Sequence, residues 1–238
     1  MVEKRAKLYE GKAKIIYDTD EAGIVISSFK EAATAFDGKK KDEISGKGAA
    51  NAQISAVLFK VLEAEGVKTH FKELVSDHEL ATIHLDMLGV EVVVRNIAAG
   101  SLAKRLGYSE GTRLKAPVVE FYYKNDDLGD PLLTRSHIGE LGLATASRVE
   151  EMRAVGLRVN EVLLDFFARR GMELVDFKLE FGMSGDDLVL ADEISPDTCR
   201  LWDVETGQKL DKDRFRRDLG GVGEAYQEVL RRVGSPSP

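Results

Sequence analysis

Apolar and polar residues alternate over short distances in the first thirty positions, as is typical of β-strands. The runs Leu8–Tyr9, Ala13–Tyr17 and Ile24–Phe29 are rich in β-branched and aromatic residues, and Gly11 and Gly23 separate them. Short strands joined by glycine turns predict an antiparallel meander at the start of the chain.

The middle of the chain combines one long helical segment with further strands. Apolar residues recur at helical spacing over Lys47–Glu65, and Gly66 supplies the stop signal. Three apolar runs then predict strands, at His70–Leu74, Leu80–Leu85 and Val90–Val94.

Two later helices are predicted from their capping signals. Ser101 is expected to cap a short helix over Leu102–Leu106. Ser147 and Glu150 form a Ser-x-x-Glu capping box, which predicts a longer helix ending at Gly171.

The last third of the chain predicts a β-hairpin followed by helical segments. Met172–Phe181 and Leu188–Ile194 are the expected strands, and Asp211–Val233 is helical with a break near residues 220–221. Because strands dominate early and helices late, an α+β fold is favoured over an alternating α/β sheet.

Composition and charge exclude several classes of function. The 238 residues carry a net charge of −7, with an isoelectric point near 5.3, which argues against nonspecific binding of nucleic acid or anionic lipid. Charged residues interrupt every apolar run before it could span a bilayer. Cys199 is the single cysteine, so no intrachain disulfide can form, and a cytoplasmic location is expected without a signal peptide.

The strand around residues 174–181 carries the most informative polar pattern. Side chains alternate between the faces of a strand, so Asp176, Lys178 and Glu180 share one face. A hairpin could bring Asp192 beside Glu180, and two such carboxylates suit magnesium bound to a nucleotide. The alternative is a solvated strand face with charges paired for solubility.

A glycine turn with two lysines forms a first candidate anion site. Gly11 would let the backbone approach a phosphate closely, and Lys12 and Lys14 would point to one side of the following strand. The alternative is an ordinary hairpin with exposed lysines. The chain contains neither a P-loop nor a Gly-x-Gly-x-x-Gly fingerprint, so those two nucleotide sites are not expected.

Further basic residues form two more candidate anion sites. Arg95 ends a buried strand shortly before the helix start at Ser101, where free N–H groups and a guanidinium could bind phosphate or carboxylate. Arg200, Lys212, Arg214 and Arg216 could form another such patch. One alternative is that Arg95 only pairs with an acidic neighbour. The other is that Lys212, Arg214 and Arg216 form the solvated face of a helix.

Six segments, in order and spacing, resemble the SAICAR synthetase family (phosphoribosylaminoimidazole-succinocarboxamide synthases) over residues 5–233. The matching segments are Leu8–Lys14, Glu91–Ser101, Val175–Gly182, Asp192–Asp197, Arg200–Asp203 and Asp211–Arg216. No functional motif departs from the family pattern.

The resemblance implies an ATP-dependent carboxylate–amine ligase of purine biosynthesis that uses ATP and Mg2+. It would join L-aspartate to 5-amino-1-(5-phosphoribosyl)imidazole-4-carboxylate. The implied fold is two-lobed α+β and related to ATP-grasp enzymes, with the ATP cleft between antiparallel-sheet lobes. Residues 1–88 would form the nucleotide-binding lobe, and residues 89–238 the substrate- and metal-binding lobe. A homo-oligomer is expected, with a dimer favoured, and no nucleic-acid or membrane partner.

The resemblance also assigns roles to individual residues. Glu180 and Asp192 would hold the metal. The residues with implied catalytic roles are Lys12, Lys14, Asp176 and Lys178. The residues implied in ATP binding are Gly11, Lys12, Lys14, the hinge residues His84, Leu85, Asp86 and Met87, and Lys124, Glu180 and Asp192. The residues implied in substrate binding are Asp37, Arg95, Ser101, Asp197, Arg200, Lys212 and Arg216.

Two other functions are compatible with the same nucleotide cleft. A small-molecule phosphotransferase would stop after phosphoryl transfer and ignore aspartate, whereas the ligase consumes it. A non-catalytic nucleotide-binding module would not turn over, and the presence of Lys12, Glu180 and Asp192 argues against it.

Overall fold

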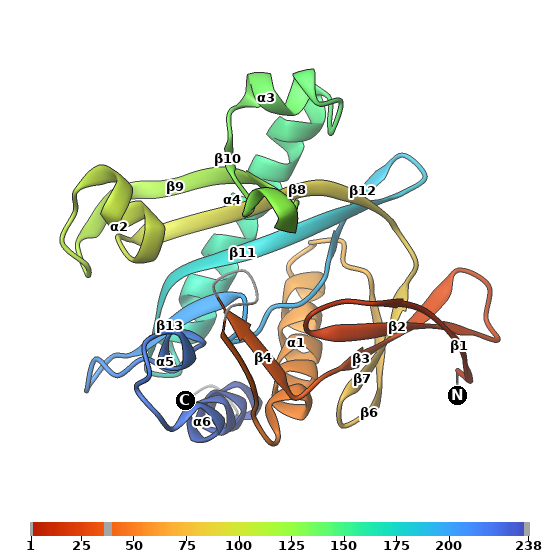
Figure 1. The fold of residues 1–238 in the computed structure, drawn as a ribbon, viewed down its shortest axis with the longest axis horizontal. Helices are drawn as coiled ribbons and strands as arrows, with labels where there is room; N and C mark the ends of the chain where they lie inside the picture. Colours follow the sequence, from red (N-terminus) through yellow and green to blue (C-terminus); the bar gives the residue numbers. More distant parts are fainter. Residues whose placement is uncertain (1, 36–39, 236–238) are drawn as a thin grey trace.

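The alternating N-terminal segments form the meander that their pattern predicts. The computed structural model describes residues 2–35 and 40–235. Its first sheet has the antiparallel strand order β1-β2-β3-β7-β6 (Figure 1). The strands of this sheet are β1 (Lys4–Glu10), β2 (Lys14–Thr19), β3 (Ile24–Phe29), β6 (Phe71–Ser76) and β7 (Glu79–Ile83). A separate two-stranded sheet consists of β4 (Ala32–Ala35) and β5 (Lys40–Glu43).

A second large sheet is built around the strand that carries the acidic pattern. Its order is β10-β9-β8-β11-β12, and β13 also pairs with β11. All of these pairings are antiparallel. The strands are β8 (Asp86–Ile97), β9 (Arg113–Tyr123), β10 (Leu132–Leu133), β11 (Met172–Ser184), β12 (Asp187–Ala191) and β13 (Cys199–Asp203). Helices and antiparallel sheets together confirm the mixed, α+β character of the chain.

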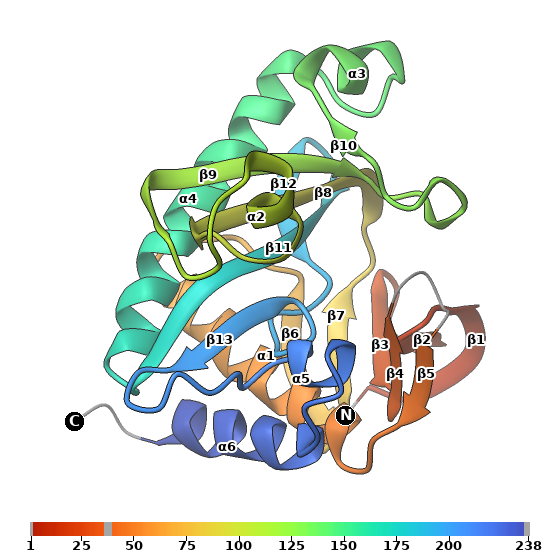
Figure 2. The same cartoon turned by 60° about the vertical axis from the view of Figure 1, so that its left-hand side comes forward.

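The helices pack on the faces of these sheets. α1 contacts β3, β6, β7 and α6, and α4 lies across β8, β9 and β11 (Figures 1 and 2). The helices are α1 (Lys47–Ala64), α2 (Gly100–Leu106), α3 (Arg135–Glu140), α4 (Ala146–Ala168), α5 (Asp213–Arg216) and α6 (Val222–Gly234), with one 3-10 turn, η1 (Asp126–Leu128). No helix in the described part of the chain is long and apolar enough to cross a bilayer.

The apolar face of β11 anchors the core. Phe177, Leu179 and Phe181 are each at most 1% exposed and belong to the main core, as alternation along the strand requires. Val175 was expected on the same face, but it is buried in a separate cluster with Ile97 and Trp202, because a register shift interrupts the pairing of β11 with β13 at this point. Burying one such side chain stabilises the fold by roughly 1.5–3 kcal/mol. This packing fixes the position and orientation of β11. Its opposite face carries the polar residues of the candidate site.

Two helix starts differ from the predicted caps. α4 begins one residue after Thr145, whose side chain accepts a hydrogen bond from the Arg148 N–H, so the predicted capping box at Ser147 and Glu150 is wrong. α2 begins after Ala99 without a side-chain cap, and Ser101 is therefore not the cap. Capping signals two residues apart compete, and the packing of the helix decides which one is used.

Several strands lacked a clear pattern in the sequence. β9 contains Pro117 and several charged residues, and β13 alternates buried Cys199 and Leu201 with the more polar-facing Arg200 and Trp202. β9 is a strand because it pairs with β8, and β13 because it pairs with β11. A local sequence pattern does not reveal such pairing with a distant segment. The second predicted hairpin strand ends at Ala191, three residues earlier than expected.

Candidate active site

A cavity of about 540 Å³ is lined by residues from both large sheets. Leu8, Ile16, Val25 and Leu85 contribute an apolar lining. The rest of the lining is rich in lysines and carboxylates, among them Lys14, Lys124, Lys178, Glu180 and Asp192. An apolar pocket that ends in convergent charged groups suits a ligand with an aromatic ring and a polyanionic tail.

Lys14 begins β2 and reaches across to the end of β12. Its Nζ forms an ion pair with Asp192 and lies 3.5 Å from Glu193 Oε1. Burial would lower the pKa of Lys14, but the charges of Asp192 and Glu193 outweigh it and raise that pKa above its ordinary value. Lys14 therefore stays an ammonium inside the cavity.

Glu180 lies between two lysines on the polar face of β11. Its side chain is 3% exposed, and its carboxylate pairs with Lys124 and with Lys178, the latter at 2.6 Å. Lys178 also contacts Glu91 at 2.8 Å. The charges of Glu180, Asp192 and Glu91 raise the pKa of Lys178, although burial opposes this.

The backbone places Asp192 beside Glu180. In the β11–β12 hairpin Glu180 faces Ala191, and Asp192 follows directly. Asp192 has a φ of 64°, in a left-handed region that residues other than glycine seldom occupy. Burial would raise the pKa of Asp192, but Lys14, Lys178 and Lys124 lower it below its usual value. The hairpin predicted to join these two carboxylates does so.

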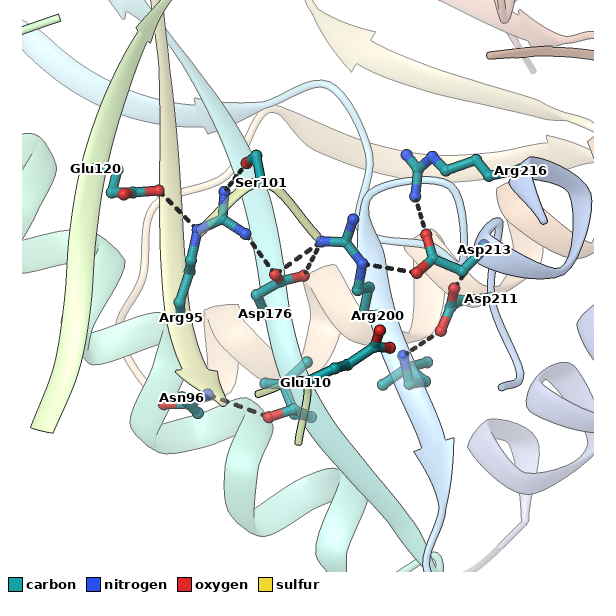
Figure 3. A network of polar contacts seen from close by, with 12 residues as sticks. Arg95, Asn96, Ser101, Glu110, Glu120, Asp176, Arg200, Asp211, Asp213 and Arg216 are labelled. Carbon is teal, nitrogen blue, oxygen red and sulfur yellow. Dashed lines mark hydrogen bonds and ion pairs between the residues drawn. The ribbon is translucent and has the colours of Figure 1, made fainter. Parts of the chain in front are cut away.

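A second cavity, of about 340 Å³, is lined by arginines and acidic residues. Buried Asp176 bridges the guanidinium groups of Arg95, at 2.6 Å, and Arg200, at 2.8 Å. Figure 3 shows how this chain of alternating charges continues at both ends, to Glu120 beyond Arg95 and to Asp213 beyond Arg200. Asp176 thus orients two arginines and is closely enclosed by them.

The first turn of α2 contacts the arginines that line this cavity. Arg95 Nη2 donates to Ser101 Oγ at 3.2 Å, so the Ser101 hydroxyl faces the arginine. Gly100 has a φ of 52°, and a Cβ atom there would come within 2.5 Å of Arg200 Nη2. Glycine at position 100 therefore allows this positive φ and leaves Arg200 in its present position.

The two cavities adjoin. The residues that line both are Lys12, Glu91, Asp130, Lys178, Asp197, Thr198 and Lys212. A group bound by the lysines of the first cavity would meet a group bound by the arginines of the second at this junction. The arrangement suits transfer of a group between two anionic ligands.

Comparison with known proteins gives a consistent family. A model described as SAICAR synthetase matches residues 7–233. A phosphoribosylaminoimidazole-succinocarboxamide synthase from Exiguobacterium sp. is 56% identical over 227 residues, 95% of this chain and 97% of that protein. The synthase from Magnetococcus marinus is 54% identical over 240 residues, 100% of this chain and 99% of the relative.

The chain belongs to the SAICAR synthetase family. A solved synthase from Ehrlichia chaffeensis has a TM-score of 0.94 at 45% identity and covers 98% of this chain and 100% of its own. A SAICAR synthetase in complex with ADP has a TM-score of 0.93 at 50% identity, covering 97% and 98%. Family membership confirms the predicted enzyme class, an ATP-dependent ligase of purine biosynthesis.

Most residues that the SAICAR synthetase resemblance singled out line the two cavities. The first cavity is lined by Gly11, Lys12, Lys14, His84, Leu85, Met87, Lys124, Lys178, Glu180 and Asp192. The second is lined by Arg95, Asp176, Asp197, Arg200, Lys212 and Arg216. Asp86, the first residue of β8, and Ser101 in α2 are not among the residues that line the two cavities. Asp37 lies outside the described residues. The functional roles of these residues stay predictions.

Three acidic residues of this SAICAR synthetase site were missed in the sequence. Glu91 and Asp130 line both cavities, and Glu193 contacts Lys14. Asp130 has a φ of 46°, the same kind of unusual backbone conformation as Asp192. Glu193 could have been found in the sequence because it directly follows Asp192. Glu91 and Asp130 could not, because strand pairing brings Glu91 to the site and a loop brings Asp130.

The hinge segment of the first cavity packs directly on β11. A Cβ atom on Gly182 would lie 2.7 Å from Leu85 Cβ and 3.2 Å from the Asp86 carbonyl oxygen. The absence of a side chain at Gly182 therefore sets how closely residues 84–87 approach the second sheet.

His70 beneath the first cavity should make stability depend on pH. Burial and the ammonium of Lys14 lower the pKa of His70 from 6.5 to about 3. Because this pKa is lower in the folded than in the unfolded chain, neutral His70 contributes its full stability above the unfolded pKa of 6.5. That contribution is lost as the pH falls from 6.5 toward 3. From pH ~7.5 to pH ~5.5, His70 should remove about 1.4 kcal/mol of unfolding free energy.

The variant His70→Gln tests this contribution by urea unfolding at both pH values. Relative to His70→Gln, the wild type should lose about 1.4 kcal/mol more on acidification. His78→Gln changes an exposed histidine and is the matched control. Parallel pH profiles for wild type and His70→Gln would contradict the prediction.

Proposed function

We propose that the chain joins L-aspartate to 5-amino-1-(5-phosphoribosyl)imidazole-4-carboxylate at the junction of its two cavities, giving the succinocarboxamide, ADP and phosphate. The observation that carries this proposal is the shared lining of a lysine–carboxylate cavity and an arginine cavity. ATP would occupy the first cavity and the imidazole nucleotide the second. The chemistry would then take place where they meet.

The nucleotide would lie with its base against the apolar lining and its phosphates against the lysines. His84, Leu85 and Met87 line the cavity at the hinge, where they would contact adenine. Lys12 and Lys14, which flank the turn after β1, would contact phosphates. The ADP bound in a relative of 50% identity supports nucleotide binding in this fold.

Glu180 and Asp192 fit a magnesium ion that arrives with the nucleotide. Within residues 2–35 and 40–235, no group of three or more His, Cys, Asp or Glu side chains could hold a metal alone. Two neighbouring carboxylates are nevertheless the usual protein share of a nucleotide-bound Mg2+, whose other ligands are phosphates and water. When bound, the ion would neutralise charge on the transferring phosphoryl group. Lys124 and Lys178, which now pair with Glu180, would then turn toward phosphate.

The second cavity would bind the imidazole nucleotide through its anionic groups. Arg95 and Arg200 line it, and their N–H groups suit a phosphate. Ser101, whose hydroxyl accepts a hydrogen bond from Arg95, would bind the same group. Lys178, Lys212 and Arg216 would contact the rest of the substrate near the junction. The charges of Asp176 and Asp213 raise the pKa of Arg200 although burial opposes this, so Arg200 stays cationic.

The chain's side chains would promote two displacements. A substrate carboxylate oxygen attacks the γ-phosphorus of ATP, and the bond from that phosphorus to ADP breaks. The aspartate amine then attacks the acyl carbon, a C–N bond forms, phosphate leaves, and the amine loses a proton. Lys12, Lys14 and Lys178 would hold the negative charge on the transferring oxygens, and the arginines would keep the carboxylate in line.

We also propose the division into lobes that the family resemblance implies. Residues 1–88 would form the nucleotide-binding lobe and residues 89–238 the substrate- and metal-binding lobe, in an ATP-grasp-like relation. A cytoplasmic homodimer is the expected form of the enzyme. Light scattering of the purified chain tests the dimer.

An ADP-release assay with the imidazole carboxylate tests the proposed reaction. ADP release should require both L-aspartate and Mg2+, and one aspartate should be consumed per ADP formed. ADP release that ignores aspartate would instead identify a phosphotransferase. No turnover under any of these conditions would favour a non-catalytic nucleotide-binding module.

A further inference from the structure

Asp197 was expected to bind substrate, but other protein groups surround its carboxylate. Its side chain is 4% exposed. Lys47 Nζ lies 2.5 Å and Asn51 Nδ2 3.0 Å from Oδ2, both from the start of α1. Tyr226 on α6 donates its hydroxyl proton to Oδ1 at 2.7 Å. A carboxylate accepts about four hydrogen bonds, so little capacity is left for a substrate.

The remaining neighbour of Asp197 is Lys212. The Lys212 Nζ lies 3.8 Å from Asp197 Oδ1, and the Lys212 side chain lines both cavities. Burial and the nearby cations Arg216 and Lys47 lower the pKa of Lys212, and the carboxylates of Asp197 and Glu193 oppose this. Asp197 is therefore the carboxylate that holds an ammonium at the junction.

The partners of Asp197 are themselves fixed by the core. Tyr226 is completely buried, and the Lys47 side chain is only 1% exposed. α6 packs on α1, so Tyr226 and Lys47 approach Asp197 from two helices that contact each other. Losing a hydrogen bond to a buried charge costs more free energy than losing one to an exposed charge. Each of these partners therefore restricts the position of the Asp197 carboxylate.

We infer that Tyr226, together with Lys47 and Asn51, is a positioning residue of the ligase. Tyr226 acts through Asp197, whose carboxylate holds the Lys212 ammonium where the two cavities meet. This inference rests on the proposed function, since Lys212 would there face the charge of the transferring phosphoryl group. The C-terminal helix thereby takes part in catalysis without touching substrate.

Tyr226→Phe removes the hydroxyl and keeps the ring. Turnover (kcat) should fall about tenfold, because a hydrogen bond to a charged group is lost and Lys212 moves off its position. KM for ATP should change less than about twofold, since Lys14 and the apolar lining remain. Val229→Ala, at a fully buried position of the same helix, is the matched control: its Tm should fall while kcat stays near the wild-type value.

A double-mutant cycle separates positioning from a general structural role. In a Lys212→Met background, Tyr226→Phe should lower kcat by less than about twofold, because the residue it positions is gone. If Tyr226→Phe lowered kcat by the same factor in the wild-type and Lys212→Met backgrounds, the inference would be overturned. So would a wild-type kcat in Tyr226→Phe, or a kcat loss in Val229→Ala as large as that in Tyr226→Phe.

A labelling experiment gives a readout that does not depend on the reaction. Competitive acetylation with acetic anhydride, followed by mass spectrometry, reports how freely Lys212 reacts. Its labelling rate should rise at least about threefold in Tyr226→Phe and stay unchanged in Val229→Ala, as release from Asp197 exposes the amine. An unchanged rate in Tyr226→Phe would overturn the inference. If wild-type ADP release ignored aspartate, the proposed function would fail, whereas the Lys212 labelling would still decide the positioning role.

Discussion

Glu180→Gln and Asp192→Asn should each lower turnover by at least about two orders of magnitude. Both carboxylates line the first cavity, and each is paired with lysines that would face phosphates. Replacing either carboxylate would remove a proposed hard oxygen ligand of magnesium and one of the counter-charges of the lysines, although Glu193 still faces Lys14 and Glu91 still pairs with Lys178. ADP release with saturating substrates measures the effect.

Two variants on the same strands serve as matched controls. Glu173→Gln changes a carboxylate of β11 whose side chain is 26% exposed, and Asp187→Asn changes one of β12 that is 62% exposed. Both pair with exposed cations and lie outside the lining of the first cavity. Their turnover should stay near the wild-type value, whereas near-normal rates in Glu180→Gln or Asp192→Asn would refute the metal role of that residue.

Asp176→Asn should cause the largest loss of stability among the site variants. Its carboxylate joins the buried guanidinium of Arg95 to that of Arg200 (Figure 3). Without the negative charge, two guanidiniums whose side chains are only 5% and 17% exposed would face each other. Removing one partner of a buried pair costs about 3–5 kcal/mol, and urea unfolding measures that difference.

Asp165→Asn is the control for this prediction. Asp165 pairs with Arg169 one helical turn away, and both side chains are about three-fifths exposed. Water screens that pair, so its loss should change the unfolding free energy by less than about 0.5 kcal/mol. A loss below about 1 kcal/mol in Asp176→Asn would mean that Glu120 and Asp213 already balance the two arginines.

Local patterns predicted the elements around the site well. The alternation in β11 indicated that Lys178 and Glu180 share a face, and Phe177, Leu179 and Phe181 of the other face are buried in the main core as expected. Periodicity is a local property, so one segment suffices to reveal it. The cap at Thr145 and the strands β9 and β13 were missed, because competing caps and neighbouring strands decided them.

The amino-acid pattern alone thus determined the faces of the strands, the hairpin that joins Glu180 to Asp192, and the candidate groups for each cavity. Which cation meets which carboxylate was decided only by the tertiary structure. Lys14 and Asp192 are 178 positions apart, and the Tyr226 hydroxyl reaches Asp197, in the turn before β13, from α6. Side-chain alternation indicates the face on which a group lies, whereas its partner depends on how distant segments pack. The packing of the two sheets and α6 places Asp197 beside Lys212.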